Sequence, residues 1–481
     1  LSMIFSEFQD PSLTPAIPVN SNGKLLGNSN GVPVRAPRDP GNAIAIANAR
    51  LSCSELRDAA DEFLVANLVV SLDQASLNRI DEISRHPTIS RGVHSVIVTL
   101  DYRPKELAES LDLFVEFRAR QMKALLTQIP GPQSARLDGL VAQERAWMNE
   151  VNAVEGPESQ EDTEERQFIR EAHTEFKRQH EEQYRLVHSG SFIRELTASI
   201  SRMPRFKTLR FETPAKIPVV RALESGEFMS AKFMSAFFTS ALQWRDIDNY
   251  VGPSLGQLEP LSILSDLPIA IRAAGATLRH YAVAKFPLYQ ESIAILAPRG
   301  EDPANPAWYN LRAAFNNLES VALQDVRGPY EDDPASSEAI TILDRFVGAA
   351  VSGPRLKTIV VSGEDIKRGF KRSAFYPLGA VLSSIRSQVV HSLVTTRVSI
   401  HQHQLETFYA HPDTRPTHSI INRGNMRSGS WEGAAEFLRL QKIADEGERY
   451  TVGFTRLGEM DDETDWDFTQ PDWALDDIVI D

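Results

Sequence analysis

The chain has 481 residues, of which 42% are hydrophobic, and a formal net charge of −14 at pH 7. This length exceeds what one small core needs, so we expect one elongated architecture or two to three domains. The acidic balance argues against a nucleic-acid partner, because a surface that follows phosphates needs clustered Lys and Arg.

Cysteine content and apolar runs bear on the compartment. A single cysteine, Cys53, excludes an intramolecular disulfide framework and CxxC-type zinc or redox sites. No apolar run approaches the roughly 18 to 20 residues of a membrane span, and residues 1–8 lack the basic flank and cleavage site of a secretory signal. We therefore expect a soluble protein of the cytoplasm or nucleus, with no membrane partner.

The first half of the chain alternates between loops and helices. Residues 9–42 are dense in Pro, Gly, Asn and Ser and predict a loop or a disordered insertion. Residues 44–70 are helical in pattern and then extended, and a helix is predicted over 105–128, between Pro104 and Pro130. Residues 155–188 predict a charged helix that buries one face. Apolar and aromatic residues seven and eight apart mark that face: Phe168, Ile169, Phe176 and Tyr184.

A short apolar pattern recurs along the rest of the chain. It reads apolar-x-x-apolar-x-apolar at 93–98, 206–211, 278–283, 318–323 and 356–361, with an imperfect sixth copy at 393–398. Its last two apolar positions alternate, as a short strand with one buried face requires. A helical pattern precedes the second, third and fifth copies, so the recurring unit is helix, turn and strand.

Units of this size cannot bury a strand face alone, so neighbouring units must stack and share a core. We therefore predict an α/β fold, an irregular solenoid similar to leucine-rich repeats, with short parallel strands and outer helices. The copies are spaced more widely than the roughly 20 to 29 residues of regular leucine-rich repeats. The alternative is an ordinary doubly wound α/β domain.

Three stretches resemble fungal F-box proteins with degenerate leucine-rich repeats. They are ARLSCSELRDAADEFLVANLVVSL from residue 49, LNRIDEISRHPTISRGVHSVIVTLDYR from residue 77, and the GSW motif at 429–431. The resemblance implies a subunit that recruits substrates to an SCF-type cullin-RING ubiquitin ligase, with the repeats holding the substrate.

The same resemblance implies a site for the ligase adaptor near the start of the chain. The apolar residues there are similar to the end of the first F-box helix, whose usual Leu-Pro-x-Glu opening is expected upstream of Leu1. The implied adaptor-binding residues are Leu1, Ile4, Phe5 and Phe8. The predicted organisation is an F-box-like segment over 1–66 with its insertion at 9–42, a solenoid over 67–443, and an acidic tail over 444–481.

Residues between the apolar strand positions are predicted to face a partner on the concave side of the solenoid. These partner-binding candidates are Thr208, Arg210, His280, Ser320, Thr358 and Val360, with Ala282 and Ala322 on the same side. A sheet face that is merely solvated is the alternative.

The sequence contains no complete catalytic, nucleotide-binding or zinc-binding motif. The sequence has no GxxxxGK[ST], no GxSxG and no GxGxxG after a strand, and His180-Glu181-Glu182 lacks the second histidine of HExxH. His401 and His403, with His411 and Asp413 nearby, could serve a metal-dependent hydrolase, but two histidines do not complete a site. We therefore predict a non-catalytic protein without cofactors, and a buried thiol at Cys53.

The end of the chain is acidic and carries aromatic residues. Residues 445–481 contain 13 acidic residues against two arginines, and they end in Ile478-Val479-Ile480 between two aspartates. Such a segment suits binding to a basic groove, addition of a strand to a partner's sheet, or folding back onto the body. The sequence leaves these alternatives open.

Overall fold

The structure of this chain is a computed structural model. It describes residues 65–127, 160–212, 231–243, 259–286, 293–299, 306–326, 336–363, 375–411, 415–444, 451–455, 458–459 and 478–480. The predicted F-box-like segment up to residue 64, its insertion, and most of the acidic tail lie outside the described residues.

Most of the described strands form a large sheet, and within it they follow one another in chain order. Neighbouring strands are parallel, except for the last pair, which is antiparallel. The strands of this sheet are β1 Asn67–Ser71, β2 Ser95–Thr99, β3 Thr208–Phe211, β4 His280–Val283, β5 Ser320–Val326, β6 Thr358–Gly363, β8 Ser392–Thr396, β10 His418–Asn422, β12 Thr451–Thr455 and β14 Ile478–Ile480. The prediction of an α/β fold with parallel strands is confirmed.

The five strands predicted from the recurring pattern are all present, as β2 to β6. In each, the first apolar residue lies in the turn before the strand and is buried, as expected. These residues are Val93, Phe206, Leu278, Leu318 and Leu356. The imperfect sixth copy coincides with β8, and the β-branched run at 68–70 lies in β1.

A smaller parallel sheet lies at the carboxyl ends of the later strands. Its strands are β7 Tyr376–Pro377, β9 Val398–His401, β11 Asn425–Ser428 and β13 Gly458–Glu459. Only Arg397 separates β8 from β9, and only Arg423 and Gly424 separate β10 from β11. Both arginines have a positive φ, near 55° and 52°. This left-handed conformation turns the chain sharply, so β8 passes directly into β9 and β10 passes directly into β11.

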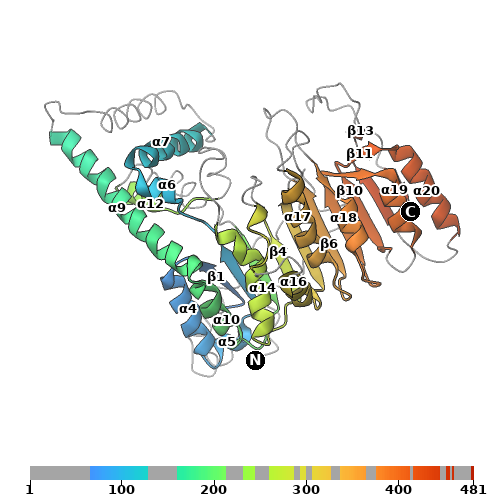
Figure 1. Cartoon of the computed structure of the whole chain (residues 1–481), viewed down its shortest axis with the longest axis horizontal. Helices are drawn as coiled ribbons and strands as arrows, with labels where there is room; N and C mark the ends of the chain where they lie inside the picture. Colours follow the sequence, from blue (N-terminus) through green and yellow to red (C-terminus); the bar gives the residue numbers. More distant parts are fainter. Residues whose placement is uncertain are drawn as a thin grey trace, which may run out of the picture.

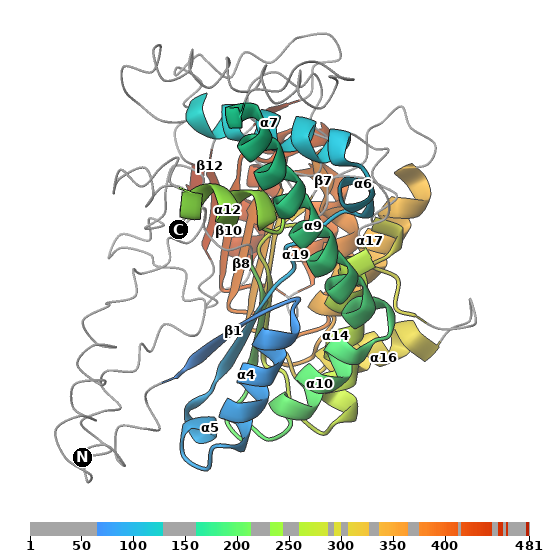
Figure 2. The same ribbon diagram turned by 90° about the vertical axis from the view of Figure 1, so that its left-hand side faces the viewer.

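The helices that connect the strands form one layer on one face of the large sheet (Figures 1 and 2). Each packs beside the next in chain order. They are α4 Gln74–Arg85, α10 Ser191–Ile200, α14 Ile263–Ala273, α16 Pro306–Phe315, α17 Ser336–Val351, α18 Gly379–Ser384, α19 Gln402–Ala410 and α20 Trp431–Ala444. Crossovers between parallel strands are nearly always right-handed, so a chain that advances one strand at a time places every helix on the same side.

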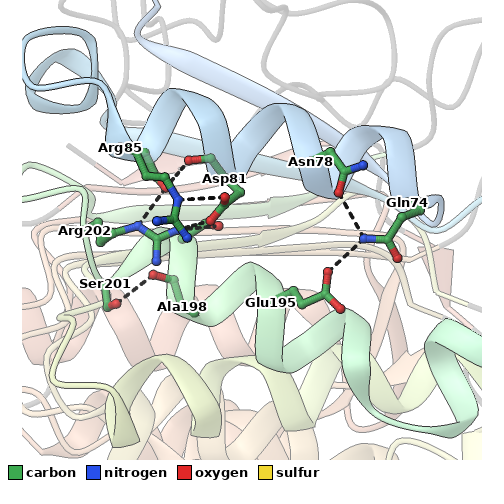
Figure 3. A network of polar contacts seen from close by, with 10 residues as sticks. Gln74, Asn78, Asp81, Arg85, Glu195, Ala198, Ser201 and Arg202 are labelled. Carbon is green, nitrogen blue, oxygen red and sulfur yellow. Dashed lines mark hydrogen bonds and ion pairs between the residues drawn. The ribbon is translucent and has the colours of Figure 1, made fainter.

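Polar contacts join the first two helices of this layer, α4 and α10 (Figure 3). Asp73 caps α4 by accepting a hydrogen bond of 2.7 Å from the Ser76 amide. Arg202, just after α10, donates to Ser84 Oγ at 2.9 Å and forms an ion pair with Asp81. At the other end of the pair, Gln74 donates to Glu195 Oε2 at 2.9 Å. These contacts fix the two helices side by side.

A proline interrupts the hydrogen bonding of α14, and a tyrosine compensates for it. Pro268 lies inside the helix and has no amide hydrogen, so the carbonyl of Leu264 loses its usual donor. The hydroxyl of Tyr281, on β4, donates to that carbonyl at 2.9 Å. Tyr281 is buried, and burial raises the pKa of its hydroxyl well above the ordinary value. The phenol thus supplies the missing donor.

A second group of helices lies beyond the carboxyl ends of the first strands (Figure 1). It comprises α6 Lys105–Glu109, α7 Leu111–Thr127, α12 Ala231–Thr239 and part of α9 Gln160–His188. Two short helices, α5 Ile89–Gly92 and the 3₁₀ helix η3 Glu259–Ser262, do not belong to this group. The single helix predicted over 105–128 is in fact two, because the chain leaves the helix at Ser110, whose Oγ accepts from the Leu113 amide. The charged helix predicted over 155–188 is present as α9. Its predicted buried stripe is wrong at Tyr184, which is exposed and stacks on His188.

Two arginines, the buried Arg118 and the partly buried Arg103, hold this group together at the end of α12. Arg118 Nη2 donates to the carbonyls of Phe238 and Ser240, and Arg103 donates to the carbonyl of Thr239. Cations next to the last carbonyls of a helix are favourable because those carbonyls are the negative end of the helix dipole. Burial lowers the pKa of Arg103 to about 10, so it stays charged at neutral pH. Phe176 of α9 lies within cation–π distance of both guanidinium groups.

Candidate functional site

The parallel register aligns the first residues of the strands into one row across the sheet. In chain order, the members of this row are Asn67, Ser95, Thr208, His280, Ser320, Thr358, Ser392, His418 and Thr451. All of them are polar. Four partner-binding candidates, Thr208, His280, Ser320 and Thr358, are therefore direct neighbours. Arg210 and Val360 lie two residues further along, in one row with Ala282 and Ala322 between them.

The structure thus brings the six partner-binding candidates together, but it buries most of them. Thr208, His280, Ser320 and Val360 are each less than 8% exposed, whereas Arg210 and Thr358 are partly exposed. His280 Nδ1 and Ser320 Oγ are 2.8 Å apart and share a hydrogen bond. The role of the six candidates in binding a partner stays a prediction. Because four of them are buried, they offer little accessible surface to a partner.

A more exposed row lies one residue earlier, at the amino ends of the strands. Its members are His94, Lys207, Arg279, Glu319, Lys357 and His391, and we call it the amino-end row. From Lys207 onward, each amide of the row donates to the carbonyl of the preceding member at 2.7 to 3.0 Å. The hydrogen-bond ladder therefore begins before the strands do, and it holds these six residues side by side.

Cations dominate the amino-end row. Glu319 lies between two of them, with its Oε1 2.9 Å from Arg279 Nη1 and its Oε2 3.1 Å from Lys357 Nζ. Partial burial raises the pKa of Glu319, but Lys357 and Arg279 outweigh this effect and hold the pKa below its ordinary value. With Lys207, three cations face one carboxylate. The row is positive on a chain that carries a charge of −14.

His280 lies directly behind these cations, and its ionisation reflects them. Burial is the main cause that lowers its pKa to about 4, followed by the charge of Lys207, while Glu319 opposes the shift. Arg279 and Lys357 lower the pKa further. The imidazole is therefore neutral at pH 7, and it forms its hydrogen bond to Ser320 without competing for anions.

We expect His280 to make the fold sensitive to acid. Its ordinary pKa is 6.5, so between pH 6.5 and pH 4 the unfolded chain binds a proton that the folded chain does not. The free energy of unfolding therefore falls as the pH drops through this range. In His280→Gln, urea denaturation should show a smaller loss between pH 7 and pH 5 than in the unmodified protein. An equal loss in both proteins would mean that another group is responsible.

The histidines considered for a metal site serve local structure. His401 precedes α19, and its Nδ1 lies 2.7 Å from Ser428 Oγ. The rings of His401 and His403 are 5.5 Å apart, and Asp413 lies outside the described residues. His180 bonds the carbonyl of Arg103 through Nδ1. Across the described ranges, no group of three or more His, Cys, Asp or Glu side chains could hold a metal ion.

The GSW motif joins α19 to α20. Gly429 has a φ of 90°, and a Cβ there would lie 2.2 Å from the side chain of Gln402. Ser430 donates its amide to Gln402 Oε1 at 2.8 Å, and its hydroxyl accepts from the Gly433 amide at the start of α20. Trp431 is buried against Gly424. The motif is thus accounted for by packing and helix capping.

Other candidates lie outside the part of the chain that the structure describes. The implied adaptor-binding residues Leu1, Ile4, Phe5 and Phe8 and the thiol of Cys53 are among them. Comparison of the chain with models of known protein families and with curated proteins finds no match. Among the described helices, none combines the length and apolar character that crossing a membrane requires.

The amino-end row was not among the predicted site residues, although the sequence carries a signal for it. Lys207, Arg279 and Lys357 each directly follow the first apolar residue of the recurring pattern. Strict alternation along a strand assigns the position of these three cations to the core side. For that reason only the residues that follow them, Thr208, His280 and Thr358, are predicted to contact a partner. The ladder geometry shows instead that these residues lie at the rim of the sheet, where the side chains of Arg279 and Lys357 are exposed. Chemically, this rim can bind anionic groups through charge and hydrogen bonds.

Proposed function

We propose that this protein is a non-catalytic, protein-binding subunit built as an irregular repeat solenoid. The observation that carries the proposal is the order of the strands, which follow the chain one after another beneath one layer of helices. A doubly wound domain would reverse its strand order at a switch point and place helices on both faces. An advancing order instead produces an extended sheet whose equivalent residues repeat from strand to strand, which is the basis of ligand binding by repeat proteins.

The ligand in this proposal is a segment of another protein that carries negative charge. The amino-end row offers Lys207, Arg279 and Lys357, each directly before a different strand and held in register by the backbone ladder. Arg210, one of the six partner-binding candidates, is partly exposed and adds a further guanidinium that is paired with Glu212. Complementary charge of this kind favours encounter and selects among partners more than it adds affinity.

The resemblance to F-box proteins supplies the biological context of the proposal. In that context the protein acts in the cytoplasm or nucleus, recruits substrates to an SCF-type cullin-RING ubiquitin ligase and needs no cofactor. Apolar residues at 1–8 would contact the adaptor subunit. A repeat scaffold with the same body but without adaptor binding is the alternative that experiment must separate.

Adaptor binding tests the ligase assignment. The full-length protein should capture purified cullin-ligase adaptor in a pull-down, and Ile4→Asp/Phe5→Asp should abolish capture, because charges on the apolar helix face prevent its burial. Circular dichroism of both proteins provides the control for folding. If the unmodified protein does not capture the adaptor, the protein is a repeat scaffold, and the ligase assignment fails.

Charge reversal tests the ligand face independently of the adaptor. A fluorescein-labelled peptide of eight glutamates serves as a probe for acidic segments, and binding is followed by fluorescence anisotropy. Lys207→Glu/Lys357→Glu should weaken binding by about tenfold or more, since each reversal both removes an attraction and adds a repulsion. The matched control, Lys232→Glu/Arg312→Glu, changes two exposed cations on helices and gives the same net charge. Equal weakening by both variants would contradict a specific role for the amino-end row.

A further inference from the structure

The last strand of the large sheet differs from all the others in its pairing. β14 runs antiparallel to β12, with Ile480 opposite Val452, Val479 opposite Gly453 and Ile478 opposite Phe454. The other edge of β12 is occupied by β10 in parallel pairing. The described part of the sheet therefore ends in a strand that the chain itself adds from a separate segment.

The pairing between β14 and β12 is short. It spans three residues of the five in β12, and the central one faces Gly453, which offers no side chain for cross-strand packing. Edge strands are ready templates for pairing with another chain, because their outer amide and carbonyl groups have no partner of their own. A ladder of three residues pairs the backbone of only part of such an edge.

Covalent connection explains how so short a strand can occupy the edge. Eighteen residues, 460–477, lie between β13 and β14, and eight of them are acidic while none is basic. A connection of this length gives the tethered strand an effective concentration on the order of millimolar at the edge. A free peptide that pairs along all five residues of β12 can therefore compete with β14 when its own affinity is moderate.

We propose that β14 is an exchangeable strand and that the edge of β12 is a docking site for an extended apolar segment of a partner protein. The partner segment would resemble Ile478-Val479-Ile480, with branched apolar side chains and acidic flanks, since that is the chemistry the edge accepts within the chain. Backbone hydrogen bonds would provide the affinity, and the branched side chains would provide the specificity. This proposal does not depend on the ligase assignment or on the amino-end row.

The probe for this site is a labelled peptide of the chain's own residues 473–481, WALDDIVID. It should bind the intact protein weakly, because β14 already occupies the edge. Ile478→Asp/Ile480→Asp in the full chain weakens the tethered competitor, so the peptide should bind at least tenfold more tightly. A control peptide with proline in place of Val479 and Ile480 should not bind, since adjacent amides point to opposite sides and one of them must face β12. Equal affinity of the peptide for both proteins, or equal binding of the proline peptide, would overturn the proposal.

A reversible lock tests the same proposal without weakening the fold. Gly453→Cys/Val479→Cys in a Cys53→Ser background places two thiols opposite each other in the ladder. The oxidised protein should not bind the peptide, whereas the reduced protein should bind it as the intact chain does. Peptide binding that is unchanged by oxidation would place the docking site elsewhere and reject the proposal. Light scattering of the proteins without peptide shows whether a second copy of the chain occupies the edge of β12. A dimer of the unmodified protein would also contradict the proposal.

Discussion

Replacing Arg118 by methionine is expected to lower the free energy of unfolding by about 2 to 5 kcal/mol, because the substitution leaves the buried carbonyls at the end of α12 without their donors. The guanidinium is fully buried and donates to Phe238, Ser240 and Gln121. Methionine keeps much of the volume and removes the charge and the hydrogen bonds. Urea denaturation followed by circular dichroism measures the difference.

Arg120→Met is the matched control for this prediction. Arg120 lies on the same helix, α7, and forms an exposed ion pair with Glu116 one turn away. Such pairs contribute about 0.5 kcal/mol or less, so the control should unfold almost as the unmodified protein does. Similar losses in both variants would show that α7 responds to any loss of arginine and that capping of α12 is not the cause.

The pair of Tyr281 and Pro268 provides the second large effect. Tyr281→Phe removes the donor to the Leu264 carbonyl and should cost about 1 to 3 kcal/mol. In a Pro268→Ala background the helix recovers the amide at that position, so the same tyrosine substitution should cost clearly less. The coupling between the two substitutions, from a double-mutant cycle of urea denaturations, should be about 1 kcal/mol.

Two outcomes would count against this explanation of α14. If Tyr281→Phe costs the same in both backgrounds, the hydroxyl does not replace the donor that proline lacks. If it costs nothing in either, the Leu264 carbonyl is satisfied in another way. Tyr309→Phe, a substitution of a largely exposed tyrosine on α16, should leave the free energy of unfolding unchanged and controls for nonspecific effects of losing a phenol.

The recurring pattern predicted strands well where the inward positions are apolar. β3 and β4 begin with Thr208 and His280, two residues after the first apolar residue of each copy, as the pattern requires. β10 escaped prediction because Ser419 occupies an inward position, where it is buried. The smaller sheet also escaped prediction, since each of its strands has only two to four residues, and β9 and β11 follow turns with a positive φ at Arg397 and Arg423. Local patterns cannot identify strands that short.

The sequence predicted one of the two rows of the candidate site. Periodicity selected Thr208, His280, Ser320 and Thr358 as neighbours, and the register confirms that they lie in one row. Periodicity could not show that three of them are buried. It also excluded Lys207, Arg279 and Lys357, because alternation was extended beyond the ends of the strands. For the acidic end of the chain, the sequence left three alternatives open, and the structure folds Ile478–Ile480 back onto β12.

The sequence by itself determined strands β2 to β6 and the helices before β3, β4 and β6, since these follow from local periodicity and from proline and glycine at the boundaries. It also predicted that these segments share one core, because none can bury its strand face alone. Only the tertiary structure decided which residues meet across the fold: Glu319 between Arg279 and Lys357, the Tyr281 hydroxyl at the Leu264 carbonyl, and Arg118 at the end of α12. These contacts join residues that are separated in the chain by 17 to 120 positions. They depend on register and packing between units, which local sequence patterns do not encode.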